Sequence, residues 1–131
     1  MEFREITLSD YDNLIPFWKE NYFVSDMDSK DRFALFLDKN PRLSLLAKEN
    51  EKIIATALGS FDGRRGYLQK VVVNQKYRGQ GIGKKITEMV MGKLKSLGAV
   101  YVPISVEENL VEFYKNCGFK TTDQISMSID L

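Results

Sequence analysis

A glycine-rich segment between a β-branched run and a long amphipathic run constrains this chain more than any other feature. Glycines stand at alternate positions in Arg78-Gly79-Gln80-Gly81-Ile82-Gly83. Valines 71–73 precede the segment, and apolar residues at helical spacing follow it from Ile82 to Leu97. Because glycine has no Cβ, the chain can turn sharply there and its amides can approach a ligand closely. A strand, a glycine turn and a helix start therefore predict an anion site, most often one for phosphate.

Two widespread phosphate motifs do not fit this segment. The Walker loop needs Ser or Thr after Gly-Lys, but Lys85 follows Gly83-Lys84, and Arg78 stands where the first glycine of that loop belongs. The dinucleotide fingerprint G-x-G-x-x-G needs one more residue between its last two glycines. A helix start that is merely rich in glycine is the structural alternative, and the strand before it and the helix after it favour the ligand site.

The segment resembles the acetyl-CoA loop (R/Q-x-x-G-x-G/A) of the GNAT family of N-acetyltransferases. A second segment, Asn109 to Phe119, is similar to a family pattern of an asparagine, a Phe-Tyr pair and a closing Gly-Phe. The resemblance covers residues 3–131, and its specific motif residues lie within 66–119. It implies an enzyme, an acyltransferase, that moves an acetyl group from the co-substrate acetyl-CoA directly to a primary amine, which a small molecule or a peptide would carry.

Length and composition set further bounds. With 131 residues the chain is expected to form a single domain, residues 1–131, around one core. A net charge of +1 gives no field for nucleic acid or for an anionic membrane. One cysteine and no histidine exclude an internal disulfide, a cysteine-based zinc site and a histidine-activated nucleophile, so no metal site is expected. No apolar run approaches a membrane span and the N-terminus is no signal peptide, so a cytoplasmic protein is the default interpretation.

Periodicity and turn residues predict an α/β domain with a mixed sheet, in the order β-α-α-β-β-β-α-β-α-β-β of the GNAT acyl-CoA N-acyltransferase fold. The expected strands are residues 3–7, 43–48, 53–60, 67–73, 100–106, 119–122 and 125–130. The expected helices are one capped by Ser9 with Asp12 in its first turn, then residues 29–38, 82–97 and 109–116. The strand–helix–strand run over 67–106 implies a parallel pair with a right-handed crossover.

The resemblance assigns roles to individual positions. Backbone amides in the strand and the glycine loop are expected to hold the pantetheine arm, the thioester oxygen and the pyrophosphate, with Asn109 touching the arm. The expected cofactor-binding residues are Val71, Val72, Val73, Arg78, Gly79, Gln80, Gly81, Ile82, Gly83, Lys84 and Asn109. Tyr114 is expected to be the acid that protonates the leaving thiolate, because a phenol of pKa about 10 keeps its proton at neutral pH. Packing of its ring beside Phe113 and positioning of the thioester are the alternatives for Tyr114, and helix capping is the alternative for Asn109.

The general base stays open. Gln69 occupies the position of a family glutamate, and glutamine cannot take a proton. Four carboxylates could act through water, and a solvated surface role is favoured for each of them: Glu107, Glu108, Asp26 and Asp28. Cys117 is interpreted as a small buried thiol, and Arg64-Arg65 as a solvated hairpin tip.

The acceptor site is expected to be walled by the two N-terminal helices and the loop at residues 21–28. Trp18, Tyr22, Phe23 and Phe33 are the candidate wall residues, with core packing as the alternative, above all for Phe33. A homodimer through the C-terminal strands is common among relatives of this kind. A function of a different class, a GNAT-fold module that binds acyl-CoA without turnover, is the alternative hypothesis.

Overall fold

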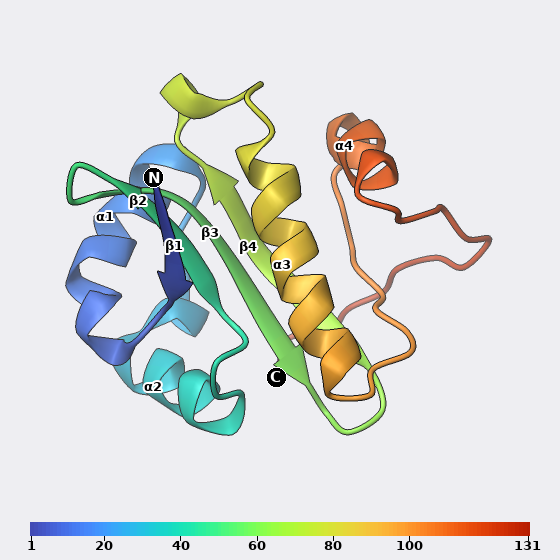
Figure 1. The fold of residues 1–131 in the computed structure, drawn as a ribbon. Helices are drawn as coiled ribbons and strands as arrows, with labels where there is room; N and C mark the ends of the chain where they lie inside the picture. The colour runs from blue at the N-terminus through green and yellow to red at the C-terminus, as the bar shows by residue number, and fades with distance from the viewer.

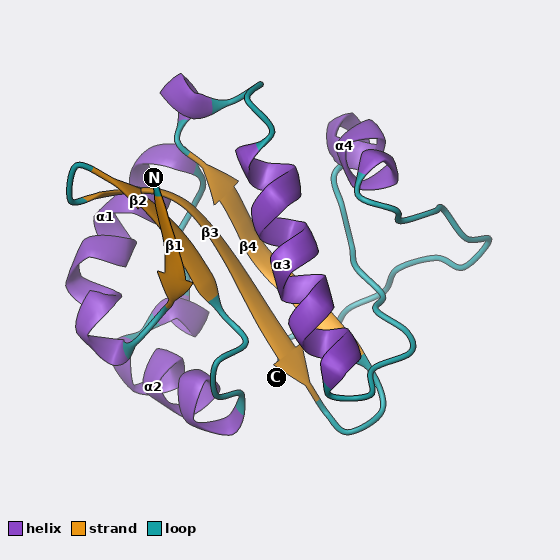
Figure 2. Cartoon of the chain, in the orientation of Figure 1, coloured by secondary structure: helices purple, strands orange, loops and turns teal.

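A four-stranded antiparallel sheet lies between helices in a computed structural model that describes all residues 1–131 (Figures 1 and 2). The strands follow the order β1 (Glu2–Glu5), β2 (Leu45–Glu49), β3 (Lys52–Phe61) and β4 (Gly66–Val73). Helices α1 (Tyr11–Asn21) and α2 (Lys30–Lys39) cover one face, and α3 (Ile82–Ser96) crosses the other. The short helix α4 (Val111–Asn116) stands beside the first turns of α3 (Figure 1). None of these helices is long and apolar enough to span a bilayer.

The core has one layer on each face of the sheet. Ile82, Ile86 and Val90 of α3 pack on the face that carries Ala55 and Ala57. On the opposite face, α1 and α2 bury Leu14, Trp18 and Phe33 against Leu46, Leu58 and Val72. A Cβ on Gly59 would lie 2.7 Å from both the carbonyl oxygen of Leu43 and Cγ1 of Val90, so this glycine lets α3 approach β3 closely. The sequence periodicity therefore identified the buried face of α3, except at Leu97, which is 53% exposed.

The antiparallel meander and the long helix after the glycine loop are confirmed. The second helix is also confirmed, with Ser29 as its N-cap accepting from the amide of Arg32 at 3.4 Å. The cap expected at Ser9 is wrong. Asp10 is the N-cap residue of α1, and Thr7 caps the 3-10 turn over Leu8–Asp10 that leads into the helix, where the amide of Thr7 donates to Asp10 Oδ2 at 2.8 Å. Pro16 lies within α1 and does not end the helix early.

The strands expected at residues 100–106, 119–122 and 125–130 do not form. Residues 100–106 are extended, but only one backbone hydrogen bond joins them to β4, from the amide of Gly66 to the carbonyl of Tyr101 at 3.0 Å. The segment after α4 makes no strand ladder, and Figure 1 shows it as a loop that extends away from α4 and then returns toward the sheet, where the C-terminus is marked. Alternating residues do not make a strand without a partner, so the sheet ends at β4 and contains no parallel pair.

Candidate active site

The glycine loop presents a row of unpaired backbone amides. Gly79 and Gly81 have φ of 81° and 82°, the left-handed region that favours glycine. The first bond of α3 runs from the amide of Lys85 to the carbonyl of Gly81 at 3.0 Å, and the N–H groups of residues 79–84 donate to no protein acceptor. Residues 79–81 are exposed. Exposed amides at the positive end of a helix are an arrangement that favours an anion.

Gly83 has a different role from the other two glycines. It lies buried in the first turn of α3, and a Cβ there would meet the ring of Phe113 at 3.1 Å and Cγ2 of Val73 at 3.2 Å. This glycine therefore allows the first turn of α3 to pack closely against α4 and the end of β4. Close packing, rather than approach to a ligand, explains the third glycine of the motif.

Arg78 uses its guanidinium to fix the loop. Its Nε donates to the carbonyl of Val73 at 3.0 Å, and a terminal nitrogen donates to the carbonyl of Asn21 at 3.3 Å. These bonds tie the loop to the end of β4 and to the end of α1. The guanidinium thus fixes the loop through two protein carbonyls, and the backbone amides, rather than this side chain, remain available to an anion.

Strand β4 is an edge strand with a bulge. Thr56 faces Val72 and Leu58 faces Gln69, so two residues of β4 oppose Ala57. The amide of Asn74 bonds inward to the carbonyl of Ile54 at 2.8 Å. Because amide direction alternates along a strand, the N–H groups of Val73 and Val71 point to the open edge. The bulge thus aims two free amides of β4 into the space between β4 and residues 100–106.

Tyr114 lies on α4 beside this edge. Its ring packs edge-on against Phe113 at 4.9 Å and Phe119 at 5.7 Å between centroids. Burial, with smaller contributions from neighbouring Cys117 and Tyr22, raises the pKa of Tyr114 to about 12. The phenol therefore stays protonated at neutral pH, and its hydroxyl makes no hydrogen bond within the protein. It is a free proton donor at the edge of the sheet.

Comparisons with known proteins identify the family. The sequence matches the acetyltransferase (GNAT) family over residues 7–119. The chain belongs to this family. A protein of Yersinia pestis named acetyltransferase is 26% identical over 131 residues, which cover 97% of this chain and 93% of the relative. Acetyl transfer is therefore the general reaction of this GNAT chain.

Solved structures confirm the GNAT fold. Glucosamine-6-phosphate N-acetyltransferase from Arabidopsis thaliana superposes with a TM-score of 0.74 at 23% identity, covering 98% of each chain. A probable acetyltransferase from Staphylococcus aureus gives 0.79 at 18% identity, covering 99% of this chain and 98% of its own. A predicted acetyltransferase from Clostridium acetobutylicum, solved with acetyl-CoA, gives 0.75 at 19% identity, over 98% of this chain and 95% of its own.

The expected acceptor wall divides into core and surface. Trp18 and Phe33 are buried and pack together with ring centroids 5.8 Å apart, so core packing is their role. Tyr22 and Phe23 are 47% and 51% exposed, with centroids 4.3 Å apart. Burial, followed by the negative charge of Glu107, raises the pKa of Tyr22. Tyr22 is thus close enough to Glu107 to be affected by its charge, and Tyr114 is in turn affected by Tyr22.

The candidate bases occupy different surroundings. Gln69 is exposed on β4, and Glu107 and Glu108 are exposed at the start of the 3-10 turn Glu108–Leu110. Asp28 is buried and paired with Lys70 at 3.1 Å, which rules out the solvated surface role favoured for it. Of the four carboxylates, Glu107 is the one whose charge is felt at the wall residue Tyr22.

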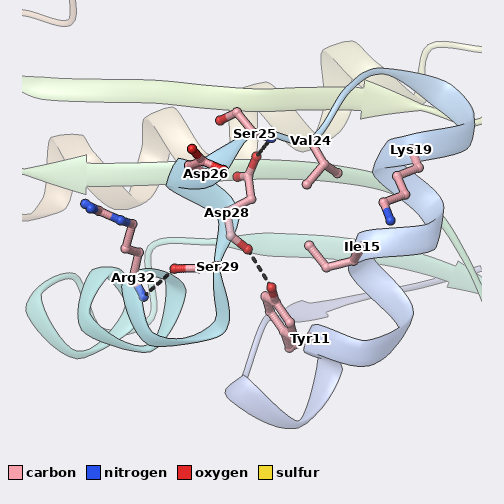
Figure 3. A pocket seen from close by; sticks show the side chains of 9 residues that line it. All are labelled: Tyr11, Ile15, Lys19, Val24, Ser25, Asp26, Asp28, Ser29 and Arg32. Carbon is pink, nitrogen blue, oxygen red and sulfur yellow. Dashed lines mark hydrogen bonds between the residues drawn. The ribbon is translucent and has the colours of Figure 1, made fainter. Parts of the chain in front are cut away.

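A groove of about 490 Å³ lies on the outer side of the 24–29 segment, between α1 and α2 (Figure 3). Its lining residues are Tyr11, Ile15, Lys19, Val24, Ser25, Asp26, Asp28, Ser29 and Arg32. Neither Tyr22, Phe23 nor Tyr114 lines it, so this groove is separate from the edge of β4. Its main structural feature is the hydrogen bond from the hydroxyl of Tyr11 to the carbonyl of Asp28, at 2.6 Å.

Other sequence predictions at the site have mixed outcomes. Asn109 lies within the 3-10 turn rather than at the N-cap of α4, where Leu110 stands, so its capping role is wrong.

Cys117 is half-buried, and burial raises the pKa of its thiol, which disfavours a reactive thiolate. Arg64 and Arg65 form the exposed hairpin tip, where both amides donate to Asp62 Oδ1 at 2.7 Å. The sequence analysis missed Lys70, because nothing in the local pattern marks a lysine that occupies a bulge.

Proposed function

We propose that this chain transfers an acetyl group from acetyl-CoA to a primary amine without a covalent enzyme intermediate. The observation that carries the proposal is the run of unbonded amides at residues 79–84, which fits a diphosphate ahead of a helix. The outward amides of Val71 and Val73 would pair with the pantetheine arm, and Asn109 would contact the same arm. Ile82 and Lys84 would supply two of the loop amides, Arg78 would hold the loop that carries them, and the buried Val72 would fix the strand position of its neighbours Val71 and Val73.

In the proposed reaction, the neutral amine attacks the thioester carbonyl. A C–N bond forms, the C–S bond breaks, and the amine gives up its proton to water or to a carboxylate through water. An outward amide of β4 stabilises the oxyanion, a contribution of roughly 3–4 kcal/mol to the barrier in sites of this kind. Tyr114 donates its proton to the leaving thiolate and recovers it from solvent. The phenol is protonated at neutral pH, as a donor must be before the reaction, and its hydroxyl is not engaged by another group of the protein.

Calorimetry with CoA and a thiol-release assay test the two halves of the proposal. The protein is incubated with acetyl-CoA and a panel of polyamines, amino acids, aminoglycosides and peptides. We expect CoA binding, and thiol release with at least one amine. If the protein binds CoA but releases thiol with no amine of the panel, and if Tyr114→Phe behaves as wild type does in both measurements, the non-catalytic acyl-CoA-binding module is supported instead. No affinity for CoA contradicts both functions.

We also propose that two copies associate through residues 125–131. Ile125, Met127, Ile129 and Leu131 are at least 81% exposed and alternate with polar residues. One side-chain hydrogen bond holds the segment, between the hydroxyls of Ser105 and Ser126 at 2.6 Å. An extended apolar stripe with free backbone groups is a pairing surface for another strand. A second copy offers the same stripe and the same open strand edges.

Sedimentation velocity tests the dimer. We expect wild type to sediment at twice the chain mass and Ile129→Asp to dissociate. Ser128→Asp places the same charge on the polar side of the segment, so it is expected to remain dimeric. A wild-type protein that stays monomeric at 100 µM, a concentration chosen on the order of typical weak dimer constants, contradicts the proposal.

A further inference from the structure

Lys70 occupies the bulge of β4, and both its backbone carbonyl and its side-chain ammonium group are hydrogen-bonded. Its φ of 49° lies in the left-handed region, which is uncommon for lysine. Its carbonyl accepts from the hydroxyl of Thr56 at 2.8 Å, and that hydroxyl accepts from the indole nitrogen of Trp18 at 3.0 Å. Trp18 and Thr56 are fully buried. Two successive side-chain hydrogen bonds, from Trp18 of α1 to Thr56 and from Thr56 to Lys70, therefore hold the bulge of β4 in place.

The ammonium group of Lys70 lies in a cage on the inner side of the 22–28 loop. The lysine side chain is only 10% exposed. Its Nζ donates to the carbonyl of Phe23 at 2.8 Å and pairs with Asp28 Oδ2 at 3.1 Å. It lies 4.6, 5.0 and 5.3 Å from the ring centroids of Phe23, Trp18 and Tyr22. Three aromatic faces and two oxygens thus hold one cation.

Asp28 passes this restraint to the rest of the loop. Its Oδ2 also accepts from the amide of Ser25 at 2.9 Å, and its carbonyl accepts from the hydroxyl of Tyr11 at 2.6 Å (Figure 3). Lys70 therefore clamps the loop to β4 at Phe23, near its beginning, and at Asp28, at its end. The exposed rings of Phe23, at the first anchor, and of Tyr22, directly before it, are thereby fixed relative to the bulge.

We propose that Lys70 is a positioning residue for the amine acceptor. It sets the separation between the strand that would hold the thioester and the loop that would hold the acceptor. This inference rests on the proposed acetyl transfer. Removing the ammonium leaves Asp28 buried without its cation and releases the loop, so the acceptor KM should rise while CoA binding persists. Coenzyme binding persists because the glycine loop lies at the N-terminus of α3 and keeps its own anchor, the bond from Arg78 to the carbonyl of Val73.

The test compares Lys70→Met, Lys70→Arg and Asp28→Asn with wild type. Lys93→Met is the matched control, since Lys93 also pairs with a carboxylate, Glu5 at 3.2 Å, but lies at the far end of α3. We expect Lys70→Met to raise the acceptor KM at least tenfold, to change kcat less than threefold, and to leave CoA affinity within twofold of wild type. Lys70→Arg should restore most of the acceptor affinity, because it returns a cation to the cage.

Two readouts need no acceptor. Chymotrypsin should cut after Tyr22 or Phe23 at least fivefold faster in Lys70→Met and Asp28→Asn than in wild type or Lys93→Met. Fluorescence of Trp18, the single tryptophan, should change in the same two variants. Unchanged cleavage and an unchanged acceptor KM overturn the inference while CoA binding stands. An equal loss of CoA and acceptor affinity also overturns it, since a general destabilisation then explains the variant. Absence of CoA binding in wild type is instead a failure of the proposed function.

Discussion

The guanidinium of Arg78 donates to the carbonyl of Val73 at 3.0 Å, which joins the first residue of the glycine loop to the last residue of β4. A second bond, to the carbonyl of Asn21 at 3.3 Å, reaches the last residue of α1. The loop is thus held at the point where a strand and a helix end. Arg78, which marks the motif in the sequence, therefore supports the glycine loop through these two bonds. The amides of residues 79–84 make no hydrogen bond within the protein and remain available to a ligand.

Replacement of Arg78 by lysine should weaken CoA binding about tenfold, equivalent to about 1.4 kcal/mol. A lysine carries the same charge, but its single ammonium cannot reproduce the planar fork that serves two carbonyls in different directions. Calorimetric titration with CoA measures the change. Arg64→Lys, at the exposed hairpin tip, is the control and should bind as wild type does. Equal affinity in Arg78→Lys would show that charge alone is sufficient at this position.

Gly81→Ala and Gly92→Ala should change stability in opposite directions. Gly81 has a φ of 82°, where an alanine is strained by about 1–2 kcal/mol. Gly92 lies in the middle of α3 with a negative φ, and a Cβ there meets nothing within 4 Å. Alanine at residue 92 should therefore stabilise the protein by about 0.5–1 kcal/mol. Urea unfolding measures both changes, and CoA titration should show a loss only for Gly81→Ala.

Local patterns in the sequence were sufficient for the part of the fold that surrounds the coenzyme. The glycine spacing, the valine run before it and the apolar stripe after it all depend on neighbouring residues, and α3 and β4 form where these patterns predict. Gly98, with φ of 98°, ends α3 as expected for a glycine just past a helix. The positions of the free amides follow from these local choices alone.

The bulge of β4 and the failure of the last three expected strands to form both depend on distant residues, so local sequence patterns predicted neither. Lys70 adopts a left-handed conformation in which its carbonyl accepts from Thr56, 14 residues away in sequence, and Thr56 in turn accepts from Trp18, which is 52 residues away from Lys70. Ile125 and Ile129 have the alternation of a strand, but no strand of their own chain pairs with them. The alternation of apolar and polar residues determines which face of a segment is apolar, but a strand forms only where another segment pairs with it.

Tyr114→Phe should lower kcat by about 10²-fold and leave CoA affinity unchanged. A factor of this size is typical of the loss of a general acid. Phenylalanine keeps the edge-on packing against Phe113 and Phe119, so the fold and the binding site are preserved. Initial rates of thiol release and CoA titration separate the two effects. A variant that keeps the wild-type kcat would assign Tyr114 to positioning of the thioester only.

Asp10→Asn should destabilise the protein by about 1–3 kcal/mol at pH 7, the range for hydrogen bonds to charged groups. Asp10 accepts from two guanidinium nitrogens of Arg4 at 2.7 and 2.9 Å and from the amide of Thr7 at 2.8 Å. Although burial opposes ionisation, these donors hold the pKa of Asp10 below its usual value of 3.8.

The stabilisation from Asp10 is present above the unfolded pKa of its carboxyl and is lost as pH falls through the lower folded pKa. Urea unfolding of wild type and Asp10→Asn should therefore give stabilities that converge as pH falls below 3.8. Asp123→Asn removes an exposed carboxylate that accepts no hydrogen bond and should change little at either pH. Equal losses in the two variants would contradict a specific role for the Arg4 pair.

Alkaline unfolding should depend on Tyr114. Its pKa is raised from 10.0 to about 12 by burial, so the folded protein holds the phenolic proton more tightly than the unfolded chain does. Stability from this difference is fully present below pH 10 and is lost as pH rises from about 10 to 12, because the unfolded chain ionises first. Melting temperatures measured from pH 8 to pH 12 should fall less steeply in Tyr114→Phe than in wild type over that window. Tyr67→Phe, on β4, controls for loss of a tyrosine elsewhere, and equal slopes in all three proteins would show that Tyr114 is not desolvated in solution.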